Sequence, residues 1–445
     1  MEISTVATLK ATANMDKSTM RRAKLFFSFA RKRFAMNKGQ FILSIKGNVH
    51  RACLLALISI FSGLLQAQTL RVGAERTEAY WADLSGKRIA VVANQTSRLG
   101  TEHLVDSLLK GGIQVVKVFS PEHGFRGHAA AGEHVANGRD ANTQLPIVSL
   151  YGSHFKPSPA DLADVDAVVY DIQDVGVRFY TYLSTLHYCM QACAENRKPL
   201  WVLDRPNPNA FYIAGPILEA NISSMVGLHP IPLVHGMTLG ELAQMINGEA
   251  WLGLPKTRNS SLRCDLHVIS IEGWKRSDEY ILPIAPSPNL PTQTSIYLYP
   301  SLGLLEGTCL SMGRGTPMPF ECYGAPWLMA SNGYRDTFTP ISIPGKAVHP
   351  PYEGQLCQGI RLDSHYIEII RNKPVLLLPF LINPYKVAPP SIKENYFKSF
   401  LTKLAGTAEL QAAIERGDEL WKIQASFEPG LRAFAEKRQP YLLYP

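Results

Sequence analysis

The chain has 445 residues, of which 46% are hydrophobic and 18% charged, with 33 glycines and 31 prolines. This composition excludes a disordered, collagen-like or coiled-coil chain, and it provides enough apolar material for the cores of two or three domains. The formal net charge of +8 suggests an acidic polymer or a membrane surface as partner, so the position of that charge along the chain has to be known first.

The positive charge is concentrated in the first 67 residues. Met1–Ala67 carries eleven Lys and Arg against two acidic residues, a net charge of +9, whereas the remainder holds 34 basic and 35 acidic residues, a net charge of −1. The segment ends in the apolar run Ala52–Leu65, which is shorter than the about 20 residues of a transmembrane helix. A basic region, a short apolar core and a small residue predict a secretory signal peptide over 1–67, with Met36 as the more natural start.

We therefore expect an exported protein, periplasmic or extracellular, that is soluble and not inserted in the membrane after signal cleavage. An uncleaved membrane anchor is the alternative. The nearly neutral remainder offers no basic stripe for nucleic acid.

Beyond residue 84, short β-branched runs alternate with amphipathic stretches. Strands are predicted at 88–93, 114–119, 146–151, 165–170, 199–203 and 266–271. Helices are predicted at 103–110, 182–197 and 238–247. Strands that alternate with helices indicate right-handed crossovers and a mostly parallel α/β sheet. Since such sheets bind ligands beyond the carboxyl ends of their strands, the polar segments there are the candidate site.

The pattern changes in the second half of the chain. The Pro- and Gly-rich stretch 285–327 shows little regular periodicity, whereas 359–371 and 373–382 return to regular structure and 392–437 is mostly helical. We expect a first α/β domain over 68–247 and a smaller α+β domain over 248–445. The six cysteines outside the leader form no C-x-x-C pair, and we expect buried free thiols.

The first polar cluster, at 120–128, directly follows a predicted strand. It contains Glu122, a candidate general acid, base or nucleophile, with His123 and Arg126 beside it. The alternative is a turn whose polar residues bond one another. The position at a strand end favours a functional role.

Two further clusters also follow predicted strands. Asp171, Asp174 and Arg178 either bind a polar ligand or form an ion-paired scaffold. Asp204 and Asn207 lie in a proline-bounded loop, where they orient the backbone or ligand hydroxyls.

The stretch 285–327 provides a second group of polar residues. Asn289 lies in the segment Ser-Pro-Asn-Leu-Pro-Thr, and Glu306, Arg314 and Glu321 follow it. Because aromatic residues are frequent here, disorder is excluded, and so long a loop is typically functional. Two carboxylates on either side of a bond are the minimum apparatus of glycoside hydrolysis.

Other chemistries lack their motifs. The sequence has no G-x-G-x-x-G, G-x-x-x-x-G-K-[ST], G-x-S-x-G or H-E-x-x-H. A zinc site from His123, His128 and His134 is an alternative whose spacing matches no recognised pattern. We expect neither a metal nor an organic cofactor.

Together these segments resemble the exo-β-N-acetylmuramidase (NamZ-like) family, long catalogued as a domain of unknown function. The resemblance covers residues 70 to 445, and its motifs occur in order at 94–96, 120–127, 170–182, 203–208, 235–243, 286–292, 299–300, 305–308, 313–316 and 319–321. It implies a Rossmann-like N-terminal domain, a smaller C-terminal domain and an active site in the cleft between them.

The resemblance also implies an activity, the release of N-acetylmuramic acid (MurNAc) from the non-reducing ends of peptidoglycan fragments such as MurNAc-GlcNAc. Glu122 matches the family's strand-end glutamate, Glu306 is the first choice for its partner and Glu321 the second. The lactyl carboxylate of MurNAc suits an arginine fork, for which Arg178 and Arg314 are candidates. A sugar-binding protein without catalysis and a metal-dependent hydrolase are the alternative functions. The sequence assigns neither acid and base roles nor an oligomeric state.

Overall fold

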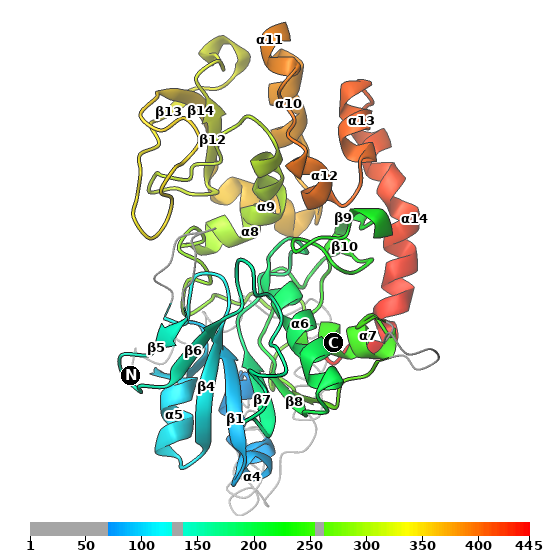
Figure 1. Cartoon of the computed structure of the whole chain (residues 1–445). Coiled ribbons are helices and arrows are strands. Elements are labelled where there is room, and N and C mark those ends of the chain that lie inside the picture. The colour runs from blue at the N-terminus through cyan, green and yellow to red at the C-terminus, as the bar shows by residue number, and fades with distance from the viewer. Residues whose placement is uncertain (1–69, 127–136, 254–261) are drawn as a thin grey trace, which may run out of the picture. The chain divides into compact units, whose positions relative to one another are not determined.

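A seven-stranded sheet, parallel except at one edge, occupies the lower half of the structure as drawn in Figure 1. The computed structural model describes residues 70–126, 137–253 and 262–445, all within one compact unit that begins at Gln68. In order across the sheet, the strands are β11 (Leu266–Ile269), β8 (Leu200–Leu203), β7 (Ala167–Asp171), β1 (Arg88–Ala93), β4 (Gln114–Ser120), β6 (Pro146–Ser149) and β5 (Gly138–Arg139). Only β5, a two-residue edge strand, pairs antiparallel, with β6.

The chain begins the sheet at its middle and winds outward twice. From β1 it proceeds through β4 and β6 on one side, then crosses back to β7, β8 and β11 on the other. This is the doubly wound order of Rossmann-like folds. The six strands predicted from the sequence are the six parallel strands, which confirms the expected α/β class.

The two faces of the sheet belong to different hydrophobic cores. Alternate residues of a strand point to opposite faces: Ala90 and Val92 of β1 lie in one core, and Ile89, Val91 and Ala93 lie in the other. Helices α6 (Tyr182–Glu195) and α7 (Leu239–Gly248) contribute to the first core, and α5 (Leu104–Lys110) contributes to the second. Both faces are therefore covered, which explains why the strands read as continuous apolar runs.

Helix α7 begins where its sequence predicts. The Thr238 hydroxyl accepts from the backbone N–H of Glu241, and the Glu241 carboxylate accepts from the N–H of Thr238, which completes a capping box. Thr238 also donates to Asp204 at the end of β8, at 2.6 Å, so the cap attaches the helix to the sheet.

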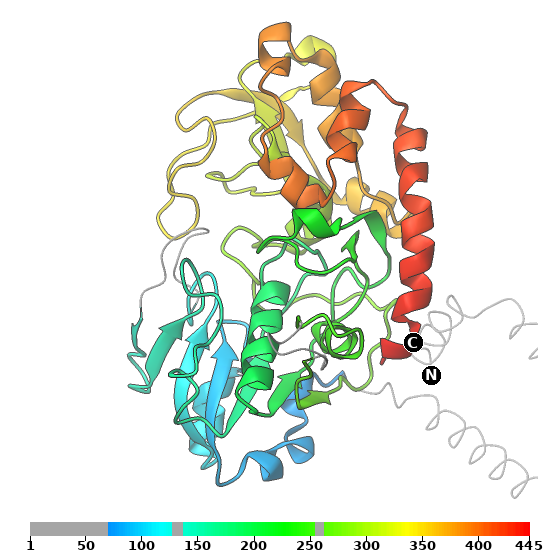
Figure 2. The ribbon, with the colours of Figure 1, turned by 45° about the vertical axis from the view of Figure 1, so that its right-hand side comes forward.

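The remaining chain adds a small antiparallel sheet and a helical layer. The sheet has the order β12 (Cys322–Ala325), β14 (Cys357–Arg361) and β13 (Asp336–Phe338). The later helices are α8 (Gln293–Leu302), α9 (Ser364–Asn372), α10 (Pro379–Val387), α11 (Pro390–Lys393), α12 (Phe400–Ala405), α13 (Glu409–Glu415) and α14 (Leu420–Arg438). Helix α14, red in Figure 2, packs on the two-stranded sheet of β9 (Ala214–Ile217) and β10 (Pro232–Val234).

The short elements complete the chain. They are η2 (Gly73–Glu75), η3 (Thr77–Ala79), α4 (Trp81–Leu84), β2 (Arg98–Leu99), β3 (Glu102–His103), η4 (Ala220–Ile222), η5 (Gly303–Gly307), η6 (Ala330–Asn332) and η7 (Gln439–Tyr441). All six cysteines of the described residues are free and five of them are buried, as the sequence predicted.

The stretch 285–327 is more regular than the sequence predicts. It contains helix α8, which Thr292 caps through Ser295, followed by η5 and strand β12. Every residue of α8 from Ser295 to Leu302 is buried. A helix buried on all sides has no polar face, so it lacks the 3.6-residue periodicity by which a helix is recognised in a sequence.

Strand β11 comes from the chain beyond residue 247, yet it extends the main sheet by pairing with β8. The C-terminus also returns to this sheet, where the Tyr444 hydroxyl donates to Asp204 at 2.6 Å. The proposed leader, 1–67, lies outside the described residues. Within the described ranges, no helix combines the length and apolar character that a membrane crossing requires.

Candidate active site

An open cavity of about 930 Å³ lies beyond the carboxyl ends of three parallel strands. Its lining includes Glu122 after β4, Tyr151 after β6 and Thr181 after β7. Helix α8, the η5 turn, helix α12 and the loop 346–351 provide other parts of its wall. The cavity therefore occupies the place where sheets of this type bind their ligands.

The cavity begins at the turn that follows β4. Strand β4 ends at Ser120, and the N–H of Gly124 closes a turn on the carbonyl of Pro121 at 3.1 Å. His123 adopts a φ of +71°, a left-handed conformation that a residue with a Cβ rarely takes. The His123 ring is 4% exposed, and its Nε2 lies 3.2 Å from the Ser287 hydroxyl. Strain at a buried residue that lines a cavity is characteristic of functional sites.

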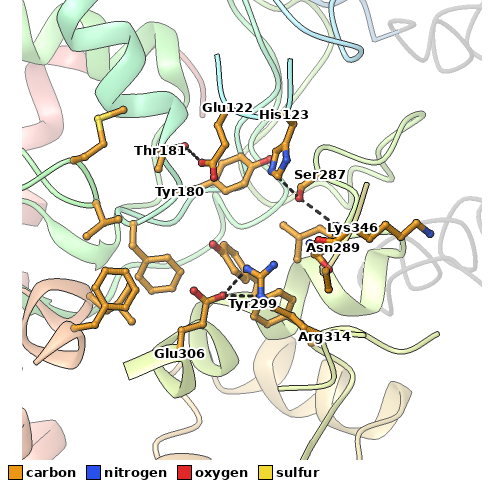
Figure 3. A pocket seen from close by; sticks show the side chains of 18 of the residues that line it. Glu122, His123, Tyr180, Thr181, Ser287, Asn289, Tyr299, Glu306, Arg314 and Lys346 are labelled. Carbon is orange, nitrogen blue, oxygen red and sulfur yellow. Dashed lines mark hydrogen bonds and ion pairs between the residues drawn. The ribbon is translucent and has the colours of Figure 1, made fainter. Parts of the chain in front are cut away.

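Glu122 points into the cavity and contacts hydroxyl groups. The Thr181 hydroxyl donates to its Oε2 at 2.8 Å (Figure 3). Burial and the neighbouring Glu122 carboxylate raise the pKa of Tyr151, so this phenol stays protonated. The Tyr182 hydroxyl approaches the backbone carbonyl of Glu122 at 3.4 Å.

Glu306 lies on the opposite wall and forms an ion pair with Arg314. Figure 3 shows its carboxylate directed toward the same space as that of Glu122. Arg314 Nε and Nη2 donate to a single oxygen, Oε1 of Glu306, at 3.2 and 2.6 Å. The guanidinium also lies over the ring of Phe320, 5.0 Å from its centre, and Phe320 is the second buried residue of the lining with a positive φ, +58°.

Tyr299 lies between the two carboxylates (Figure 3). Burial raises its pKa well above the usual value, and the charges of Glu306 and Glu122 act in the same direction. Its ring makes edge contacts with Phe179 and Phe320, at 5.1 and 4.9 Å between ring centres. The cavity therefore combines two carboxylates with aromatic surfaces of the kind on which a sugar ring packs.

Asn289 is the third polar residue of the wall that the sequence singled out. It is 3% exposed, and its Nδ2 donates to the carbonyl of Lys346 at 2.8 Å. This bond attaches the loop 346–351 to the rest of the lining. The structure thus brings together Glu122, His123, Asn289, Glu306 and Arg314 of the predicted residues.

The other predicted residues lie outside this lining. Arg126 pairs with Asp140 at 2.8 Å and Asp106 at 3.2 Å, near helix α5. Glu321 contacts the hydroxyl of Thr292 at the start of α8.

Asp171, Asp174 and Asp204 are buried and do not line the cavity. Arg205 holds Asp171 through two hydrogen bonds of 2.5 and 2.8 Å. Burial raises the pKa of Asp174 to about 7 and that of Asp204 to about 6. Asn207, which was expected to orient either the backbone or ligand hydroxyls, donates to the carbonyl of Met237 at 2.8 Å.

Arg178 is 1% exposed, and within the described ranges it donates only to backbone carbonyls. Nη1 bonds those of Pro216 and Ile231 at 2.8 and 2.6 Å, and Nη2 bonds that of Ala405 at the end of α12 at 2.5 Å. Its guanidinium is therefore committed to the scaffold and does not reach a ligand carboxylate in the cavity.

Sequence reasoning missed three parts of the lining: Tyr151, Thr181 and the loop 346–351. Tyr151 ends the third predicted strand, and Thr181 lies within the motif at 170–182. Both could have been predicted from the expectation that ligands bind beyond the carboxyl ends of parallel strands. The loop carries no motif that could have identified it.

The described residues contain no group of three or more His, Cys, Asp or Glu placed to hold a metal ion. Of the histidines in the zinc alternative, His128 and His134 lie outside the described residues.

A doubly wound α/β unit with a cavity beyond its strand ends, and with carboxylates on facing walls, has the parts that a glycoside hydrolase needs. Comparison with known families specifies it further. The N-terminal model of exo-β-N-acetylmuramidase NamZ matches residues 89–294, and the C-terminal model matches residues 297–444. The chain belongs to the exo-β-N-acetylmuramidase NamZ family.

Individual relatives agree with this assignment. The chain is 39% identical over 383 residues to the peptidoglycan β-N-acetylmuramidase NamZ of Bacillus subtilis (strain 168), covering 82% of this chain and 89% of that protein. Two DUF1343 family crystal structures from Bacteroides fragilis NCTC 9343 share the fold. The match to one of them has a TM-score of 0.75 and 44% sequence identity, and it covers 85% of this chain and 99% of that protein. The match to the other has a TM-score of 0.66 and 30% sequence identity, and it covers 84% of this chain and 99% of that protein.

Proposed function

We propose that this protein is an exo-acting β-N-acetylmuramidase that releases MurNAc from the non-reducing ends of peptidoglycan fragments. Glu122 and Glu306 are its catalytic carboxylates. The observation that carries this proposal is their placement on facing walls of one cavity, from segments far apart in the sequence. The activity named for the Bacillus subtilis relative supports the substrate class.

Arg314 is the residue that meets the lactyl carboxylate of MurNAc. Glu306 occupies its Nε and Nη2, and its Nη1 makes no hydrogen bond to any residue in the described ranges. An arginine that faces the cavity with remaining N–H groups can receive a second carboxylate without breaking its first pair. Asn289 and His123 supply further polar contacts to the sugar.

We further propose that the chain is exported and that residues 1–67 are its signal peptide. N-terminal sequencing of the protein recovered outside the cytoplasm tests this, with a start near Gln68 expected. A mature protein that retains the apolar run 52–65 contradicts cleavage and favours the anchored alternative.

The test of function compares a chromogenic β-muramoside with the matching β-N-acetylglucosaminide. The muramoside is turned over, and the glucosaminide, which lacks the lactyl group, is turned over far more slowly. Equal rates refute the specificity. Saturable binding of MurNAc-GlcNAc with no sugar released on long incubation favours the binding-protein alternative, and loss of activity with a chelator that zinc restores favours the metal-dependent one.

Glu122→Gln tests the catalytic assignment. Loss of a general acid or nucleophile lowers the rate of MurNAc-GlcNAc hydrolysis by about 10²-fold or more. Full activity in this variant removes Glu122 from the catalytic pair. Glu195→Gln is the matched control, because Glu195 lies on the surface in an ion pair with Lys156.

A further inference from the structure

The two carboxylates of the cavity have hydrogen-bond partners of different kinds. Glu306 Oε1 receives two bonds from Arg314, at 3.2 and 2.6 Å. A guanidinium has only donors and does not lose its charge in proteins. Protonation of Glu306 removes the ion pair and leaves a partly buried cation uncompensated, because the Arg314 side chain is only 20% exposed. Glu306 therefore has a permanent cation as its partner.

The two hydroxyl groups that contact Glu122 from the described residues tolerate both forms of a carboxyl group. The Thr181 hydroxyl, 2.8 Å from Oε2, donates to a carboxylate and can equally accept from a carboxylic acid. The Tyr151 hydroxyl, also beside this carboxylate, has the same property. These two contacts can therefore be made by either form of the carboxyl group.

We propose that Glu122 is the general acid of the pair, that Glu306 remains ionised opposite it, and that Thr181 is a positioning residue that acts through Glu122. This assignment rests on the proposed function and deepens it by giving each carboxylate a role.

The Glu122 carboxyl proton passes to the glycosidic oxygen, and the bond between the anomeric carbon and that oxygen breaks with its electron pair on the oxygen. The Glu306 carboxylate faces the positive charge that develops at the anomeric carbon. Water supplies the hydroxyl group of the released MurNAc, and its other proton returns Glu122 to the acid form.

The other titratable and charged groups that face the pair come from several elements. Among the described residues they are His123 beside Glu122, Tyr151 after β6, Tyr180 and Tyr182 at the start of α6, Tyr299 on α8, Arg314, and Lys346 and His349 of the loop 346–351. Burial raises the pKa of each of the four tyrosines, so these phenols stay neutral over the range in which an acid and a base of this kind titrate.

The experiment uses two substrates that differ in their need for an acid. The leaving group of MurNAc-GlcNAc is GlcNAc, whose glycosidic oxygen must be protonated as the bond breaks. The leaving group of 2,4-dinitrophenyl β-muramoside, in contrast, departs as an anion without protonation. In Glu122→Gln, kcat/KM for the disaccharide falls by about 10³-fold, within the range of a lost general acid, and that for the activated glycoside falls by less than about tenfold. Glu306→Gln loses activity on both substrates. Glu195→Gln stays at the wild-type level on both.

The outcomes separate the two proposals. A wild-type protein that turns over neither substrate contradicts the proposed function itself. If the wild type is active, two results overturn the role assignment. One is that Glu306→Gln keeps its activity on the activated glycoside. The other is that Glu122→Gln loses activity equally on both substrates. Far-ultraviolet circular dichroism shows that each variant is folded, and if Glu306→Gln is not, Glu306→Asp, which keeps the charge, takes its place.

Thr181 is tested by a readout that a structural role does not change. In Thr181→Val the alkaline limb of the pH–rate profile for the disaccharide moves to higher pH, because ionised Glu122 has lost a donor, and Thr181→Ser restores the limb. A lower rate in Thr181→Val with an unmoved alkaline limb refutes the positioning role.

Discussion

Asp174 carries a pH-dependent contribution to stability that a single substitution removes. It is 3% exposed, and its Oδ2 accepts from the N–H of Gly176 at 2.7 Å. The nearest titratable ring is that of His235, whose Nε2 lies 3.6 Å from Oδ2. Burial lowers the pKa of His235 to about 3, so this ring is neutral near pH 7 and supplies no charge. Burial without a cation raises the pKa of Asp174 from 3.8 to about 7.

The sign of the effect follows from proton binding. In the unfolded chain Asp174 loses its proton near pH 4, and in the folded protein it loses it near pH 7. Between these values the folded state binds more protons, so the free energy of unfolding falls as the pH rises. A rise from 3.8 to about 7 corresponds to about 4 kcal/mol, lost between about pH 4 and pH 7.

Asp174→Asn removes the titrating group and keeps its size. Urea unfolding of the wild type and the variant at intervals from pH 4.5 to 8 measures the difference. Relative to the wild type, the variant gains about 3 kcal/mol between the two ends of that range. The surface variant Asp83→Asn controls for loss of a carboxylate and runs parallel to the wild type. If Asp174→Asn also runs parallel to the wild type, the carboxyl group ionises in the folded state as it does in the unfolded chain, and the reasoning is refuted.

Three further substitutions have definite expected outcomes. Arg205→Met leaves Asp171 buried and unpaired, so the free energy of unfolding at pH 7 falls by about 3–5 kcal/mol in a urea titration, and a loss below about 1 kcal/mol would show that the pair is dispensable. Thr238→Ala removes both the α7 cap and the bond to Asp204, and costs about 1–3 kcal/mol in the same assay, whereas Thr238→Ser recovers most of it. Glu321→Gln retains most of the muramidase activity, because its carboxylate lies outside the cavity lining, and a loss as large as that of Glu306→Gln would return Glu321 to the catalytic pair.

The strands and their polar ends were predictable because their signals are local. Runs such as 88–93 are continuous and apolar since both faces of the sheet are covered, and each run stops where polar residues begin. Glu122 was predicted from its position after such a run. The capping box of Thr238 and Glu241 was equally local, since the residues that make it lie three apart.

Two kinds of feature could not be read from the sequence: the direction of some strand-end side chains, and helix α8. Both have the same physical origin. Arg178 follows a strand, as a ligand-binding residue does, but its side chain turns inward to carbonyls of β9, β10 and α12, which lie far away in the sequence. Asp171 likewise turns to Arg205. Helix α8 was hidden because tertiary contacts bury it on all sides. A side chain's direction and a helix's surroundings depend on neighbours that a local pattern does not contain.

By itself, the sequence of this protein determined which segments become parallel strands and which polar residues stand at their ends, because both depend on neighbours a few residues apart. Its motifs also determined the family. Only the tertiary structure decided which carboxylates share a cavity: Glu306, held by Arg314, faces Glu122, whereas Glu321 does not. That choice depends on how α8 and the η5 turn pack beyond the strand ends, and such packing is set by contacts between segments that are distant in the chain.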